Sequence, residues 1–139
     1  MSFIIGKKVG MTRTFSDDGA VTPVTVIFAE GGQEFKAGDL VKIAGITKGR
    51  GFQGAVKRHG FHGMPASHGH HHVLRHVGSI GQRFPQHTLK GMRMAGHMGA
   101  VRQTTRGLTV VSMDKEQNML AVKGAVPGRK GTVLEISKI

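Results

Sequence analysis

The chain has 139 residues, enough for one small domain but not for a second sizeable core. Lysine and arginine total 20 against 8 aspartates and glutamates. This formal net charge of +12 favours a polyanionic partner, because bound phosphates release condensed counterions. No apolar run approaches the roughly 20 residues of a membrane-spanning helix, so we expect nucleic acid and no membrane as the partner. The chain contains no cysteine, and its first apolar stretch is too short for a secretion signal, so we expect a reducing, cytoplasmic setting.

The first predicted strand covers residues 24–28, a β-branched run of alternating pattern. The Asp-Asp-Gly sequence at residues 17–19 is typical of the turn that would precede it in a hairpin. A shorter apolar run at residues 40–43 follows a Gly-Asp pair and predicts another strand.

Three further strands are predicted near the other end of the chain, at residues 108–113, 119–123 and 132–136. Turn residues separate them at 114–118 and 127–128. Helical periodicity is weak throughout. Five or six short strands with such turns favour a mainly β fold, and specifically a small closed barrel without exposed edges.

The middle of the chain has a different character. Residues 40–113 contain no aspartate or glutamate, but eleven lysines and arginines, all nine histidines and many glycines. Glycine offers no side chain to pack and adds entropy to the unfolded chain, so such a stretch does not build an ordinary core. We expect residues 45–106 to form an extended loop that is ordered mainly against RNA, and residues 1–44 with 107–139 to form the barrel.

Two other interpretations of the loop are weaker. A disordered linker would not space phenylalanine, leucine and methionine among its cations, since isolated apolar groups need something to pack against. A histidine-rich metal site is suggested by residues 68–72 and by the spacing of His72 and His76, but no carboxylate or thiolate is near and Arg75 adds repulsion. We therefore expect no metal and no cofactor.

Catalysis is poorly supported. Ser67 and Ser79 have histidines within the same segment, but the acid that would orient a catalytic histidine is absent from it. Residues 124–132 have the wrong order for a phosphate loop, and a strand follows them instead of a helix. The chain is expected not to be an enzyme, and a freestanding RNA chaperone is one alternative for its function.

Several motifs together resemble the bacterial ribosomal protein L3 family. They are Ile5-Gly6-Lys7-Lys8-Val9-Gly10-Met11-Thr12-Arg13, then residues 18–19, 23–27, 45–54, 56–58, 67–69, 78–82, 90–91, 94–99 and 122–128, in the family's order across nearly the whole chain. The resemblance implies a barrel of the translation elongation factor type and a loop threading through ribosomal RNA towards the peptidyl transferase centre. It also implies a structural role in early large-subunit assembly, beside ribosomal proteins fourteen and nineteen.

The residues predicted to bind large-subunit (23S-type) ribosomal RNA follow from the cationic segment and from this resemblance. Their expected role is to neutralise phosphates and to position the loop, with little reading of base sequence. They are Lys48, Arg50, Lys57, Arg58, His59, His62, His68, His70, Arg75, Gln82, Arg83, Lys90, Arg93, His97 and Arg102.

The chain departs from the family pattern in two places. Residues 30–33 stand where most bacterial members carry a sizeable additional segment, and a further stretch before Gly45 is also missing, which makes this a shortened form. Residues 83–87 differ in length and order from the commoner loop tip, where some bacteria methylate a glutamine. The resemblance therefore assigns that modification to neither Gln82 nor Gln86.

Overall fold

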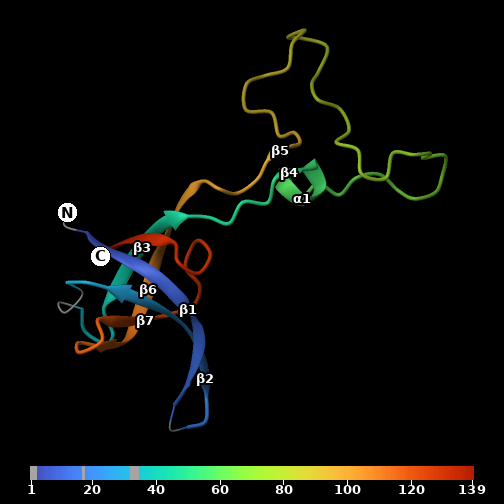
Figure 1. Ribbon diagram of the computed structural model, residues 1–139. Helices are drawn as coiled ribbons and strands as arrows, with labels where there is room; N and C mark the ends of the chain where they lie inside the picture. The colour runs from blue at the N-terminus through green and yellow to red at the C-terminus, as the bar shows by residue number, and fades with distance from the viewer. Residues whose placement is uncertain (1–2, 17, 32–34) are drawn as a thin grey trace. The chain divides into compact units, whose positions relative to one another are not determined.

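The computed structural model describes residues 3–16, 18–31 and 35–139, and it is mainly β (Figure 1). Its internal contacts divide the chain into two units. Met1–Lys48 together with Ala100–Ile139 form the first, which we call the sheet unit, and Gly49–Gly99 form the second, which we call the loop unit. No helix in the described part of the chain is long and apolar enough to cross a membrane.

Six antiparallel strands make up the sheet unit, and each pairs with two others. Their order is β1-β2-β7-β6-β3-β8, and it returns to its start because β8 also pairs with β1. Closure of this kind gives each strand a partner on both sides. The strands are β1 (Ile4–Phe15), β2 (Val21–Ala29), β3 (Leu40–Ile46), β6 (Arg102–Asp114), β7 (Met119–Lys123) and β8 (Val133–Lys138).

The prediction of a mainly β fold is confirmed. The strands expected at residues 24–28, 40–43, 108–113 and 119–123 lie within β2, β3, β6 and β7, and the one expected at 132–136 overlaps β8. The pattern does not mark out β1, although the predicted hairpin implies such a partner. Of the turn predicted between β1 and β2, Asp17 lies outside the described residues, whereas Gly19 has a φ of 78° that suits a tight turn.

The core of the sheet unit is formed by side chains that alternate along the strands. On β8, Leu134 and Ile136 are fully buried, whereas Val133 is 60% exposed. Ile27 on β2, Ile43 on β3, and Leu120 and Val122 on β7 complete the centre of the same apolar cluster. Five of the strands contribute buried apolar side chains to this single core, and β1 adds the partly buried Ile4.

Lys8 is a polar exception inside the sheet unit. The residue is only 8% exposed, and its ammonium donates hydrogen bonds to the carbonyl oxygens of Val126 at 2.9 Å and Gly128 at 3.0 Å. Burial lowers the pKa of Lys8, and the charge of Lys48 lowers it further. The side chain therefore joins β1 to the segment that precedes β8, at the cost of removing a charge from water.

Replacing Lys8 by methionine is expected to lower the free energy of unfolding by about 2–3 kcal/mol, because two carbonyl groups lose a charged donor. Urea unfolding of the purified protein measures this change. Lys7→Met is the matched control, since Lys7 is the exposed neighbour on the same strand and its loss should change stability by less than about 0.5 kcal/mol. Equal effects of the two substitutions would contradict this role for Lys8.

The loop unit contains little regular structure. It has the short strands β4 (Phe52–Gln53) and β5 (Gly96–His97), which pair with each other, and one helix, α1 (Ala55–His59). Figure 1 shows the remainder as an irregular trace from the end of α1 to β5. The weak helical periodicity of the sequence does not reveal α1, which is shorter than two turns.

Candidate nucleic-acid interface

The chain leaves the sheet unit after β3 and returns to it at β6, where Thr47 and Val101 join the two passages. The amide and the hydroxyl of Thr47 both donate to the Val101 carbonyl oxygen, at 3.0 and 3.1 Å. The Val101 amide donates back to the Thr47 hydroxyl at 3.3 Å. These bonds fix the two ends of the excursion beside each other on the sheet.

Inside the loop unit, α1 carries the residues that hold the outgoing and returning passages together. The Arg58 guanidinium donates to the Met94 carbonyl oxygen at 2.8 Å, and a ring nitrogen of His59 lies 3.1 Å from the same oxygen. A Cβ atom at Gly96 would lie 2.7 Å from the Arg58 guanidinium, so a larger residue there would require this flexible side chain to shift. Arg58 and His59 therefore contribute to the order of the loop itself, in addition to any contact with RNA.

A second close approach joins residues farther along the loop. The Met64 amide donates to the Leu74 carbonyl oxygen at 3.1 Å. Gly63 precedes it with a φ of +79°, and a Cβ atom there would lie 2.0 Å from the same carbonyl oxygen. This position requires glycine for two reasons, its left-handed backbone and the lack of space.

Gly63→Ala is expected to open this crossing and to raise amide hydrogen exchange at Met64 at least about tenfold, the equivalent of 1.4 kcal/mol. Gly69→Ala is the matched control, because Gly69 has a similar φ of +81° but nothing within 4 Å of the added Cβ atom. The control substitution adds backbone strain alone and should leave the Met64 amide protected. Identical exchange in both variants would show that crowding at Leu74 is unimportant.

The loop unit also has a small apolar cluster of its own. A hollow of about 580 Å³ is lined largely by apolar groups, among them Met64, Val73 and Val77, with His70 and Arg75 also lining it. Apolar side chains in a linker would have no such neighbours. The phenylalanines and leucines spaced among the cations do not line this hollow, and Phe52, Leu74, Phe84 and Leu89 are exposed.

The predicted RNA-binding residues are mostly exposed. Arg58 and His59 are half-buried, and the other thirteen residues predicted from the sequence are exposed. All of them lie in the loop unit except Lys48 and Arg102, which belong to the sheet unit, Arg102 as the first residue of β6. The structure thus presents the side chains to solvent but does not gather them into one pocket.

The histidines do not form a metal site in the described part of the chain, where no group of three or more potential ligands is close enough to hold an ion. His68 and His72 have left-handed backbones, with φ of 59° and 57°. Such conformations are uncommon for residues other than glycine, but histidine, like asparagine and aspartate, adopts them more often than most. Here they turn the backbone sharply within the glycine-rich run.

The positive charges of the loop unit form no ion pair with any residue in the described part of the chain. The two ion pairs among the described residues, Arg102 with Glu135 and Lys138 with Asp39, both belong to the sheet unit. In the loop unit, Arg83 stacks over the ring of Phe84 at 5.6 Å, which leaves its charge in place. Exposed cations without acidic partners attract a polyanion most strongly at low salt.

Comparison with known proteins identifies the family. The model of the ribosomal protein L3 family matches residues 5–119. Large ribosomal subunit protein uL3 of Vibrio cholerae is 35% identical over 195 aligned positions, which cover 92% of this chain and 93% of the relative. The uL3 protein of Hydrogenovibrio crunogenus is 35% identical, with 97% of each chain covered, and that of Chloroherpeton thalassium is 50% identical over 73% of this chain and 50% of its own.

The lengths of these alignments agree with the shortened form expected from the sequence. An alignment of 195 positions exceeds the 139 residues of this chain, so the Vibrio cholerae relative has segments without a counterpart here. The match nevertheless extends over most of both chains. The chain therefore belongs to the ribosomal protein L3 family.

Proposed function

We propose that this protein is a structural constituent of the large ribosomal subunit in the cytoplasm, where it binds large-subunit ribosomal RNA through the loop unit and catalyses no reaction. The observation that carries this proposal is the exposed, acid-free surface of the loop unit, whose cations have no ion-pair partner among the described residues. Phosphate groups of folded RNA would supply the missing negative charge. Membership of the ribosomal protein L3 family supports the same assignment.

The finer parts of the proposal come from the family resemblance. The closed order of the six strands suits a barrel of the translation elongation factor type, placed at the surface of the subunit. The loop would reach towards the peptidyl transferase centre, and the protein would act early in subunit assembly. Ribosomal proteins fourteen and nineteen are the proposed neighbours.

Sedimentation of a cell lysate through a sucrose gradient tests the proposal. The protein is expected to travel with large subunits and with assembled ribosomes, and to be nearly absent from the soluble fraction. A freestanding RNA chaperone would remain mostly soluble, and this outcome would overturn the ribosomal assignment. Elemental analysis of protein purified without metal resins tests the histidine-rich metal site, which requires a nearly stoichiometric metal content.

A further inference from the structure

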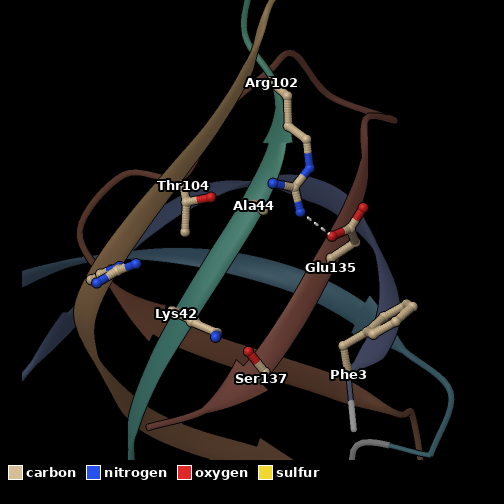
Figure 2. A pocket seen from close by; sticks show the side chains of 8 residues that line it. Phe3, Lys42, Ala44, Arg102, Thr104, Glu135 and Ser137 are labelled. Atoms are coloured by element: carbon tan, nitrogen blue, oxygen red, sulfur yellow. Dashed lines mark hydrogen bonds and ion pairs between the residues drawn. The ribbon is translucent and has the colours of Figure 1, made fainter. Parts of the chain in front are cut away.

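A hollow of about 320 Å³ lies on the outer face of the sheet unit, over three adjacent strands. Figure 2 shows side chains from β3, β6 and β8 converging on it, with the ring of Phe3 at one edge. Its lining consists of Phe3, Lys42, Ala44, Arg102, Thr104, Arg106, Glu135 and Ser137. We call this feature the outer hollow.

The strand register explains why a hollow forms at this place. Ala44 of β3 is paired with Thr104 on one side and with Glu135 on the other. Its side chain faces outward, because the neighbouring Ile43 is the residue that belongs to the apolar core. A single methyl group at the centre of three strands, surrounded by longer side chains, leaves a depression above it.

Polar groups surround this depression. Lys42 is paired with Ser137 one step along the same face, and Ser137 is only 8% exposed. Arg102 donates a hydrogen bond to the Glu135 carboxylate, which holds the guanidinium over β3 (Figure 2). With Arg106, the hollow contains three cations and one carboxylate, together with the hydroxyl groups of Thr104 and Ser137.

We propose that the outer hollow binds a phosphodiester group of ribosomal RNA, as a second contact separate from the loop unit; this inference rests on the proposed function. A phosphodiester carries one negative charge and accepts hydrogen bonds only, and the lining offers a positive excess with lysine, arginine and hydroxyl donors. A fixed arginine loses less freedom on binding than a mobile one. Glu135 keeps Arg102 in place and also weakens the attraction of the hollow for an anion.

The sequence indicates part of this site. Of the residues that line the outer hollow, however, only Arg102 is among the RNA-binding residues predicted from the sequence. Arg102, Thr104 and Arg106 alternate along one strand, and Lys42 and Ala44 alternate along another. Alternation places each set on one face of its own strand. The contribution of β8 cannot be found in this way, because Glu135 and Ser137 are distant in sequence and join the site only through strand pairing.

Binding of the full-length protein to a transcript of large-subunit ribosomal RNA, measured over a range of salt concentrations, tests the inference. Lys42→Gln and Arg106→Gln should each weaken binding about threefold to tenfold and make the slope of log affinity against log salt shallower by about 0.7–0.9. Glu135→Gln should act in the opposite direction and strengthen binding about twofold to fivefold, because it removes a repulsive charge but keeps an oxygen acceptor for Arg102.

Lys115→Gln is the matched control for charge, since Lys115 is an exposed lysine of the sheet unit outside the outer hollow. The urea midpoint of every variant verifies that it folds. If the wild-type protein binds RNA but the three hollow variants all behave as the control, the inference is overturned and the proposed function stands. A wild-type protein without salt-dependent binding would instead overturn the proposed function itself.

Titration with inorganic phosphate alone distinguishes RNA from a free anion. At constant ionic strength, phosphate should not compete with the transcript below about millimolar concentrations, because the hollow supplies only a few contacts to an isolated anion. Competition at micromolar phosphate would show a dedicated site for the free anion and would overturn the assignment to RNA.

Discussion

Leu134→Ala is expected to lower the free energy of unfolding by about 2–5 kcal/mol, a large share of the roughly 5–15 kcal/mol typical of a small domain. Leu134 has no exposed surface, and it lies in the apolar core of the sheet unit. The substitution removes one methine and two methyl carbons from a closely packed apolar site. Urea unfolding followed by circular dichroism measures the loss.

A second substitution tests whether the loss arises from the space around Leu134. A Cβ atom at Gly45 on β3 would lie 2.6 Å from a methyl carbon of Leu134, whereas its other neighbours would be no closer than 3.5 Å. Gly45→Ala alone should therefore cost about 1–3 kcal/mol by overpacking. Once Leu134 is replaced by alanine, the Cβ atom added at Gly45 has only ordinary van der Waals contacts with its remaining neighbours. The double variant should therefore be no less stable than Leu134→Ala.

Val133→Ala is the matched control for this cycle, because Val133 lies on the same strand but is 60% exposed. Its cost should remain below about 0.5 kcal/mol. Additive losses for Gly45→Ala and Leu134→Ala would contradict the packing that the structure shows, since two residues in contact are expected to be coupled.

The strands of the sheet unit could be predicted where period-two alternation is unbroken, as on β2 and β7. Strand β1 was not predicted from the sequence, and the reason is physical. Its register with β2 shifts between Lys8 and Gly10, and such a bulge breaks the alternation. In addition, Ile5, Val9 and Met11 are apolar and exposed on this strand, so its outer face does not appear polar in the sequence.

The glycines and lysines of the motif at residues 5–13 show what a sequence resemblance cannot explain by itself. A Cβ atom at Gly6 would lie 2.8 Å from a side-chain carbon of Ile27 on the neighbouring strand. Lys8 reaches carbonyl groups at Val126 and Gly128, more than one hundred residues away. The motif therefore reflects close packing and a buried charge, and both become visible only once the strands are paired.

The candidate interface was predictable in its charge but not in its internal order. The absence of acidic residues from the middle of the chain is a property of composition, and it appears directly in the sequence. The hydrogen bond from Arg58 to the Met94 carbonyl joins residues 36 positions apart, and no local sequence pattern predicts it. Helix α1 is likewise too short for periodicity, and Gly60 ends it with a left-handed backbone at φ 74°.

Neutralising four exposed cations of the loop unit is expected to weaken binding to large-subunit ribosomal RNA at least about 30-fold at moderate salt. The variant carries Arg50→Gln, Lys57→Gln, Arg75→Gln and Lys90→Gln. Arg58 is left unchanged, because its bond to Met94 orders the loop and its loss would confuse folding with binding. The measurement is the affinity of the full-length protein for the transcript as salt concentration rises.

The slope of log affinity against log salt should be about −4 to −5 for the wild-type protein, if half of the eleven cations between residues 40 and 113 meet phosphates. Each lost phosphate contact makes the slope shallower by about 0.7–0.9. Two to four lost contacts therefore predict a change of about 1.5–3.5 in the four-site variant. An unchanged slope would mean that these side chains do not meet phosphates.

A matched variant of the sheet unit separates local contacts from overall charge. Arg13→Gln, Lys115→Gln, Lys123→Gln and Arg129→Gln remove the same two arginines and two lysines from exposed positions outside both the loop unit and the outer hollow. If attraction to RNA depended only on net charge, this variant would lose as much affinity as the first. Because contacts at phosphates release counterions one by one, we expect it to retain most of the wild-type slope, and equal losses would mean that net charge, and not contacts of the loop unit, sets the affinity.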